Sequence, residues 1–271
     1  NIGFLVRYQI GWMYWRYFMW NFAGRQNGEQ GYYAWDDSSG NWISGIKPLD
    51  EMRLGNLDEL PEEAKNNPAQ NTYFLLPFIF GLIGLFWHAG RRKNEFIGLL
   101  GLFVITGIGI IIYTNQPPNE PRERDYVLVG SFFVFCMCMG MPVPAIYDLL
   151  RTKMNQKGFA MAGVASAVVL IAPLLMGFQN WDDHSRAQHS GSRDYASNFL
   201  SSVDPNSIIF TYGDNDTYPL WYAQEVEGIR TDVRVVNLSL IAVDWYIDLL
   251  RYKMHDSPPI NVTLHQDLLR V

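Results

Sequence analysis

The sequence predicts a polytopic α-helical membrane protein with about four transmembrane helices, followed by an α/β soluble module. The first observation is that four segments contain no Asp, Glu, Lys or Arg: residues 73–89, 96–113, 126–147 and 158–178. Each is about the length that a helix needs to cross roughly 30 Å of hydrocarbon. The second is that short alternating strand-like and helix-like segments follow residue 181. Four apolar runs of this kind exclude an ordinary soluble protein.

Three parts follow from this division: an aromatic interfacial segment and outer loop at 1–71, four transmembrane helices at 72–178, and the α/β module at 179–271. Within the first part, residues 10–22 carry seven aromatic side chains around Arg16. This density favours the headgroup level of a bilayer. The end of an earlier span and a hydrophobic core helix are the alternatives. Because the chain opens on Asn1 and ends inside a continuing pattern, we expect an internal piece of a longer protein.

The distribution of Lys and Arg predicts the topology. Basic residues lie in the short loops at 91–93 and 151–157, which places these loops in the cytoplasm. Residues 24–71 and 179–271 are then on the opposite side. Acidic residues outnumber basic ones by nine to four in the first of these regions and by thirteen to seven in the second. This excess argues against nucleic acid as a partner.

The membrane spans carry few signs of chemistry. His88 and Asp148 are ionisable, but both lie at span edges. The lack of charge at mid-membrane counts against a transporter or channel. The glycine pairs Gly81/Gly84, Gly98/Gly101 and Gly107/Gly109 predict close helix–helix contacts.

The α/β module is predicted as a helix at 192–203, a strand at 208–212, a helix at 219–227, a strand at 233–238 and a helix at 244–254. Strand–helix–strand at this spacing indicates a parallel pair. Ligands gather at the carboxyl ends of such strands. Asp214, Asn215 and Asp216 follow the first strand, where a site and an ordinary Gly-Asp-Asn turn are both open.

A second group of polar residues follows the last span. Asp182, Asp183 and His184 could hold a divalent cation or share a proton, or they could be solvated charge and helix caps. Aromatic residues near both acidic groups, Trp181, Trp221 and Tyr222, could stack on sugar rings or fill the module's core.

Several tracts of the chain resemble a known family: YWRYFMWNFAGRQN at 14–27, PRERDY at 121–126, QNWDDH at 179–184, GDNDT at 213–217 and PLWYAQEVEGIR at 219–230. Together they are similar to the bacterial family called domain of unknown function 2723, which is related to eukaryotic multi-span protein O-mannosyltransferases. The resemblance covers nearly the whole chain. It implies a glycosyltransferase of GT-C type that uses a polyprenyl-phosphate sugar at the outer, periplasmic face of the bacterial inner membrane.

The resemblance also limits what can be assigned. In GT-C enzymes the catalytic carboxylate usually lies in the first outer loop, which is not in this chain, so no catalytic residue carries over. Arg122 and Arg124, in the loop between the second and third spans, are the candidates for contact with a lipid phosphate. Asp182, Asp183, His184, Asp214, Asn215, Asp216, Trp221 and Tyr222 are the candidates for contact with the acceptor or substrate, and a divalent cation is an open possibility.

The predicted function is transfer of a sugar from a polyprenyl-phosphate donor to an envelope or secreted protein, with the lipid bilayer as the surroundings. In such a reaction a carboxylate takes the proton of the acceptor hydroxyl. The competing class is a non-catalytic membrane-anchored binding or assembly protein of the cell envelope.

Overall fold

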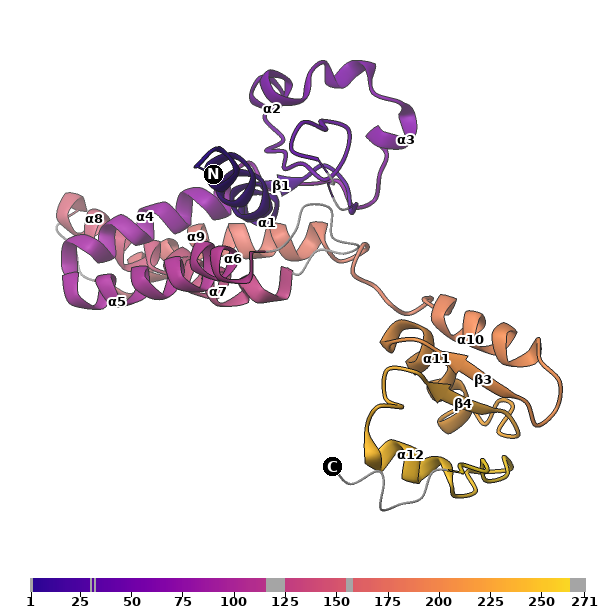
Figure 1. The fold of residues 1–271 in the computed structure, drawn as a ribbon. Coiled ribbons are helices and arrows are strands. Elements are labelled where there is room, and N and C mark those ends of the chain that lie inside the picture. The colour runs from indigo at the N-terminus through magenta and orange to yellow at the C-terminus, as the bar shows by residue number, and fades with distance from the viewer. Residues whose placement is uncertain (1, 30, 32, 116–124, 155–157, 264–271) are drawn as a thin grey trace. The chain divides into compact units, whose positions relative to one another are not determined.

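The computed structural model describes residues 2–29, 31, 33–115, 125–154 and 158–263. The chain divides into two compact units, Asn1–Ser185 and Arg186–Val271. The first unit contains the apolar helices and a polar segment between residues 24 and 72 (Figure 1). The second contains one parallel pair of strands with helices around it.

Helices make up most of the first unit. In chain order they are η1 (Phe4–Arg16), α1 (Tyr17–Phe22), α4 (Leu76–Arg91), α5 (Lys93–Val104), η3 (Ile105–Gly109), α6 (Ile110–Thr114), η4 (Asp125–Leu128), α7 (Val129–Gly140), α8 (Pro142–Met154) and α9 (Phe159–Gln179). The element η1 is a π-helix that runs directly into α1, and η3 is a π-helical turn between α5 and α6.

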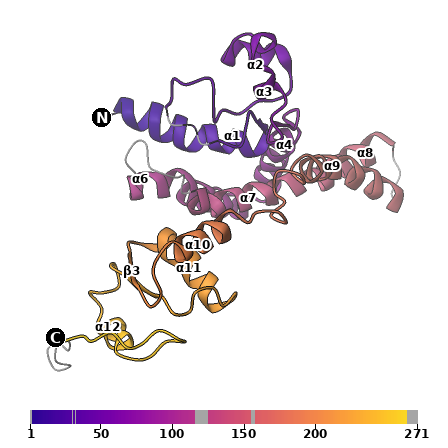
Figure 2. The ribbon, with the colours of Figure 1, turned by 90° about the vertical axis from the view of Figure 1, so that its right-hand side faces the viewer.

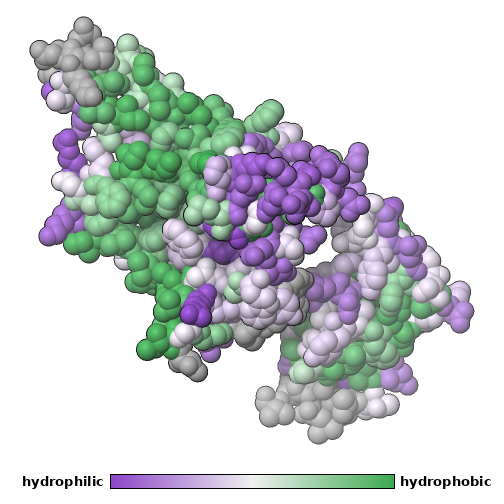
Figure 3. All heavy atoms as spheres, turned by 90° about the horizontal axis from the view of Figure 1, so that it is seen from above, coloured by the Kyte–Doolittle hydropathy of each residue, from purple (hydrophilic) through white to green (hydrophobic). Residues whose placement is uncertain are grey.

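Among the residues that the structure describes, three helical stretches are long and apolar enough to cross a membrane: Lys93–Thr114, Tyr126–Thr152 and Phe159–Gln179. The sequence predicted four spans. The remaining one, α4, has 16 residues, and a helix of that length covers about 24 Å, less than the roughly 30 Å of a hydrocarbon core. Hydrophobic side chains form a broad band over the helices (Figure 3). Large apolar residues of these helices, such as Phe86, Phe133 and Leu174, are exposed, which fits a lipid environment.

The aromatic N-terminal helix contributes to the core of this unit. Tyr14, Phe18 and Phe22 are buried, and their rings meet those of Phe103 and Phe135 on the apolar helices. Edge-on pairs of this kind add to the free energy gained by burial. The segment is therefore a packing element of the helical unit.

Glycine lets two of the apolar helices approach closely. A Cβ at Gly81 would meet the ring of Phe135, and one at Gly84 would overlap the backbone carbonyl of Cys138. The close contact predicted for this pair is confirmed. A Cβ at Gly98 or Gly101 would meet no neighbour among the described residues, so the contact predicted there is absent.

The polar segment of the first unit lies at one end of these helices. It contains β1 (Gly24–Arg25), α2 (Lys47–Leu54), η2 (Leu57–Glu59), α3 (Glu62–Lys65) and β2 (Asn71–Thr72), with β1 and β2 antiparallel. Figure 2 shows α2 and α3 to one side of the apolar helices. The backbone N–H of Thr72 donates to Oε1 of Gln179, at 2.6 Å. This bond joins the polar segment to the carboxyl end of α9.

The basic residue Arg91, between the first two predicted spans, lies at the end of a helix. Arg91, the last residue of α4, donates to Oδ2 of Asp148 on α8, at 2.7 Å. Helix α4 begins just after β2, which belongs to the polar segment, and ends at Arg91. The basic residues at 91–93 and the polar segment therefore lie at opposite ends of α4. Within the first unit, the basic residues at 91–93 are thus separated from the polar segment, as predicted for this pair of regions.

The second unit contains α10 (Gly191–Ser201), β3 (Ile208–Thr211), α11 (Asp214–Glu225), β4 (Arg234–Asn237) and α12 (Asp244–Leu250). Strands β3 and β4 are parallel, and Ile208 pairs with Arg234, so the predicted parallel pair is confirmed. Helix α11 begins at Asp214, five residues before the predicted start at Pro219. Gly213, with φ of 80°, allows the sharp turn from strand to helix. Acidic side chains in the first turn of α11 are then favoured by the helix dipole.

Candidate functional site

Asp183, just after the end of α9, connects three parts of the first unit. Its Oδ2 accepts from Nη1 of Arg25 at 3.1 Å and from Nδ2 of Asn71 at 2.9 Å. Its Oδ1 lies 2.6 Å from Nδ1 of His184. The side chain is 7% exposed, and a buried carboxylate requires such partners. Asp183 therefore fixes the polar segment to the membrane exit of α9.

Arg25 is held between Asp183 and an aromatic ring. Its guanidinium lies 4.5 Å from the ring centroid of Trp20, within the range of a cation–π contact. The side chain is 11% exposed. The buried Nε of Arg25 and the buried indole nitrogen of Trp20 have no acceptor among the described residues. Two buried donors without acceptors are unusual in a folded protein.

Neighbouring residues of the QNWDDH tract strengthen this junction. Gln179 accepts from the backbone of Thr72, and Nδ2 of Asn180 donates to the hydroxyl of Tyr73 at 2.6 Å. The tract thus uses Gln179, Asn180 and Asp183 to hold β2 against the end of α9.

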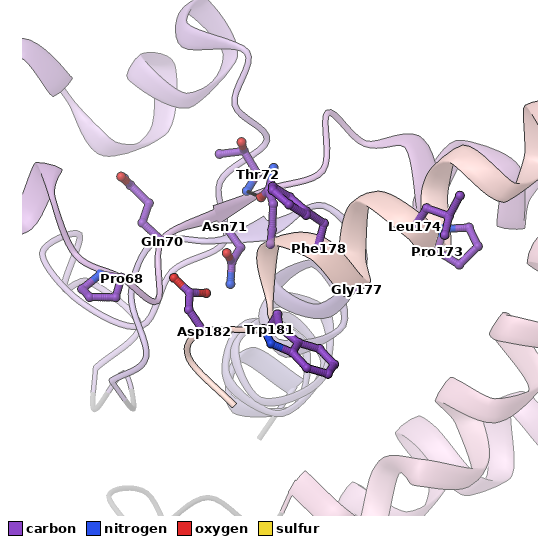
Figure 4. Close-up of a pocket in the computed structure, with 11 residues that line it drawn as sticks. Pro68, Gln70, Asn71, Thr72, Pro173, Leu174, Gly177, Phe178, Trp181 and Asp182 are labelled. Atoms are coloured by element: carbon purple, nitrogen blue, oxygen red, sulfur yellow. Dashed lines mark hydrogen bonds between the residues drawn. The ribbon is translucent and has the colours of Figure 1, made fainter. Parts of the chain in front are cut away.

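Trp181 and Asp182 of the tract line an open pocket of about 830 Å³. Figure 4 shows Trp181 and Asp182 beside Asn71 and Phe178. Trp181 is 83% exposed. The complete lining comprises Pro68, Gln70, Asn71, Thr72, Pro173, Leu174, Gly177, Phe178, Gln179, Trp181 and Asp182. We name this the exit pocket.

The exit pocket combines two kinds of surface. Leu174, Gly177 and Phe178 belong to the apolar helix α9, whereas Gln70, Asn71 and Asp182 supply amide and carboxylate groups. Amides and a carboxylate bind hydroxyl groups, and an exposed indole offers a face for the C–H surface of a ring. The described residues of the lining include no Lys or Arg. This chemistry suits a neutral polyhydroxyl ligand next to an apolar chain.

His184 is positioned by its neighbours. Nδ1 lies 2.6 Å from Asp183 and 3.1 Å from the backbone oxygen of Asn180, while most of the side chain is exposed. A carboxylate at Nδ1 favours the tautomer with its proton there. Nε2 is then the nitrogen open to a ligand. Of the three predicted residues here, the structure places Asp183 in the junction, Asp182 in the exit pocket and His184 on Asp183.

The acidic residues of the second unit have different surroundings. Asp214, Asn215 and Asp216 are exposed in the first turn of α11, at the carboxyl end of β3 as predicted. Their side chains make no hydrogen bond to any residue that the structure describes. Their position alone is compatible with both predictions, a site and a helix start.

A buried polar network lies beneath this turn. The hydroxyl of Thr217 lies 2.7 Å from that of Thr211 and donates to the backbone oxygen of Gly213. Nδ2 of Asn237 donates to Thr217 at 3.1 Å, and the backbone N–H of Asn237 donates to the hydroxyl of Tyr246. Burial raises the pKa of Tyr246, the hydrogen bond from Asn237 opposing it. The network joins both strands to α11 and α12.

The predicted aromatic residues of the second unit divide in the same way. Trp221 is partly buried and packs against both hydrophobic clusters of the unit, so it serves the core. Tyr222 is exposed and lines a pocket of about 700 Å³ together with His189, Arg193 and Tyr218. Only Tyr222 of this pair is accessible to a ligand.

One prediction concerns residues that the structure does not place. Arg122 and Arg124 lie outside the described residues. Among the residues that are described, no group of three or more His, Cys, Asp or Glu side chains could hold a metal ion.

Sequence reasoning missed Arg25 and Asn71. Both belong to the region between the aromatic helix and the first span, 158 and 112 residues from Asp183. The one available signal for Arg25 was its place in the YWRYFMWNFAGRQN tract. Asn71 carried no signal in the sequence.

Comparison with known proteins gives one finding. Residues 192–270 match the family described as TMEM260-associated domain 2. No curated protein and no solved structure matches the chain. The matched range lies within the second unit, Arg186–Val271. This part of the chain is therefore similar to a domain associated with TMEM260.

Proposed function

We propose that the protein is a membrane-embedded glycosyltransferase of GT-C type, which transfers a sugar from a polyprenyl-phosphate donor to a protein acceptor outside the cytoplasm. The observation that carries the proposal is the composition of the exit pocket. Its apolar wall is part of a helix that is long enough to span a membrane. Its polar wall comes from the segment between residues 24 and 72 and from Asp182 after the end of α9. A polyprenyl-phosphate sugar has the same division between an apolar chain and hydroxyl groups. Its phosphate is proposed to contact Arg122 and Arg124, which lie outside the described residues.

In this proposal Asp182 accepts a hydrogen bond from a hydroxyl group of the bound sugar or acceptor. Trp181 stacks on a ring of the same ligand. Asp183 remains the buried partner of Arg25 and Asn71. It also binds Nδ1 of His184, which leaves Nε2 open to solvent. The base that takes the acceptor proton is left unassigned, as the resemblance places it outside this chain.

The second unit is the soluble α/β module of the proposal, on the same side as the polar segment. Asp214, Asn215 and Asp216 are proposed contacts for the acceptor, because they are exposed and have no partner among the described residues. The similarity of residues 192–270 to a TMEM260-associated domain supports a membrane protein of this general kind.

The test is a transfer assay with the purified full-length protein in nanodiscs, a polyprenyl-phosphate sugar and envelope proteins as acceptors. We expect Asp182→Asn to reduce kcat/KM by about tenfold or more, since a lost hydrogen bond to a charged group corresponds to about 1.5–3 kcal/mol. Trp181→Ala removes the stacking surface and should also reduce kcat/KM. Matched controls are Glu62→Gln and Trp35→Ala, which change an exposed carboxylate and an exposed indole away from the pocket.

The same assay separates the competing function. A protein that binds envelope components without transferring a sugar would be the non-catalytic assembly protein. Absence of transfer from every polyprenyl-phosphate sugar tried, by protein that is folded, would reject the transferase proposal.

A further inference from the structure

A second pocket of the first unit has the opposite charge character to the exit pocket. Its volume is about 330 Å³, near the lower limit of roughly 300–1,000 Å³ for small-molecule sites. Three arginines line it, Arg7, Arg16 and Arg53, with one carboxylate, Asp37. The other lining residues are Gly11, Trp12, Trp15, Ala34, Asn41, Trp42 and Leu54. We name this the arginine pocket.

Two of the arginines are fixed in position. Arg16 is 7% exposed, and it donates through Nε to the backbone oxygen of Trp12 and through Nη1 to that of Gly40, at 3.2 and 2.6 Å. Its guanidinium lies 4.4 Å from the ring centroid of Trp12. Arg53 donates to the backbone oxygen of Trp42 at 3.0 Å and lies 3.6 Å from that ring. Guanidinium groups held in this way lose little entropy when they bind a ligand.

Donors remain for a ligand. Of the five N–H groups of Arg53, one bonds to Trp42, and the others have no acceptor among the described residues. Arg7 is exposed and likewise has no acceptor in the part of the chain that the structure describes. Burial lowers the pKa of Arg53, with Asp50 and Asp37 opposing it. A further negative charge close to Arg53 would therefore stabilise its cationic form.

The two nearby carboxylates, Asp37 and Asp50, balance only part of the three positive charges. Asp50 is buried and already accepts from the backbone N–H groups of Ser44 and Gly45 and from the Ser44 hydroxyl. Asp37 is exposed. The lining carries three positive charges and one negative charge, so the pocket favours an anion.

The geometry of the helix supports a binding role as well. Arg7, Gly11, Trp12, Trp15 and Arg16 all belong to the π-helix η1. The spacing of four residues from 7 to 11 to 15 brings one face of this wider helix to the pocket. Departures from α-helical geometry of this type occur frequently at functional sites.

We propose that the arginine pocket binds a phosphate group, with its indole side chains contacting the apolar or ring part of the same molecule. Planar guanidinium groups match the oxygen pairs of a phosphate. The phosphate can belong to a lipid headgroup or to a soluble phosphate compound. The proposal does not depend on the transferase function, because it concerns binding alone.

The test uses tryptophan fluorescence, since three indoles line the pocket. The purified protein in phosphatidylcholine nanodiscs is titrated with inorganic phosphate in one arm. In the other arm the nanodiscs contain increasing fractions of undecaprenyl phosphate. We expect Arg7→Gln and Arg53→Gln each to weaken binding about tenfold, and Arg53→Lys to weaken it less because the charge is kept. Lys47→Gln, on the same helix as Arg53 but outside the lining, is the matched control.

The outcomes are distinct. Binding in both arms that depends on Arg7 and Arg53 identifies a general phosphate site, and binding in the lipid arm alone identifies a headgroup site. Failure of both probes to bind overturns the proposal, as does equal binding by Arg7→Gln, Arg53→Gln and Lys47→Gln. Arg7 is exposed, so its variant tests the pocket even if a change at Arg53 impairs folding. The transfer assay is a separate measurement and does not decide this result.

Discussion

The two units of the protein each contain an acidic tract that looks like a site in the sequence, but they use it differently. In the first unit Asp183 is buried and bonded to residues more than a hundred positions away. In the second unit Asp214 and Asp216 are exposed in the first turn of a helix. One carboxylate holds the structure together, and the other two are available for a ligand.

This difference shows that a carboxylate's role depends on its partners more than on its motif. Asp182 and Asp183 are adjacent, yet one lines the exit pocket and the other joins β1 and β2 to the end of α9. In the proposed transferase, a variant of either residue would lower transfer for a separate reason. Stability measurements therefore have to accompany every activity measurement on this tract.

The largest effect is expected from Asp183→Ala. The change leaves the buried guanidinium of Arg25 without its carboxylate and removes an acceptor from Asn71. Removal of one partner from a buried ion pair typically costs about 3–5 kcal/mol. We expect the unfolding free energy in detergent to fall by about that amount, measured by thermal or chemical denaturation. A change as small as that of Asp182→Ala would contradict the structural role.

The second prediction concerns the packing of α4 against α7 in the first unit. Gly84→Ala would place a methyl group against the backbone carbonyl of Cys138, whereas Gly98→Ala would meet no described neighbour. Overpacking typically costs about 1–3 kcal/mol, so Gly84→Ala should destabilise the unit by that amount. Gly98→Ala is the control and should be neutral or slightly stabilising. Equal melting temperatures for the two variants would show that α4 and α7 are not in close contact.

The sequence was sufficient for features that depend on local composition. Uncharged runs predicted the apolar helices, and turn and strand patterns predicted the parallel pair of the second unit. The close approach at Gly84 also followed from residue type. In contrast, Gly98 belongs to a similar glycine pair and has open space, because the neighbour of a helix face is set by tertiary packing.

The contacts of the candidate site could not be predicted in the same way. Arg25 and Asp183 are 158 residues apart, and nothing in either tract specifies the other as its partner. Helix α11 began earlier than predicted because Gly213 turns the chain directly into the helix. Proline at position 219 marked the middle of that helix and not its first turn.

In the second unit, Thr217→Val tests the buried polar network, as Asp183→Ala tests the buried ion pair of the first unit. The hydroxyl of Thr217 joins Thr211, Gly213 and Asn237. Valine keeps the shape but leaves the buried amide of Asn237 without this acceptor, at a cost of about 1–3 kcal/mol. Thr217→Ser retains the hydroxyl and is the control. The expected result is a lower midpoint in denaturant for valine than for serine, measured on the whole protein by tyrosine or tryptophan signals of the second unit.

A smaller, pH-dependent effect is expected at Asp232. Hydrogen bonds from Arg230 and from the backbone of Asn206 lower its pKa. Since the folded-state pKa lies below the usual value of about 3.9, the stabilisation is complete above that pH and is lost as the pH falls below it. The difference in melting temperature between wild type and Asp232→Asn should therefore be constant near neutral pH and shrink in acid. Asp256→Asn serves as a comparison, and a difference that grows in acid would contradict the prediction.

The smallest effect on stability is expected at Asp214 and Asp216, and it is the sharpest test of the contrast between the units. Both side chains are exposed, and neither makes a hydrogen bond to any described residue. Surface changes of this kind usually alter stability by less than about 0.5 kcal/mol, and loss of a charge from the first turn of α11 adds a similar amount at most. Asp214→Asn and Asp216→Asn should thus have the same melting temperature as the wild type. Any loss of sugar transfer or acceptor binding in these variants would then report direct contact with a ligand. Unchanged transfer and binding in both variants would assign these residues to the start of the helix alone, and the acceptor contacts would then have to lie elsewhere.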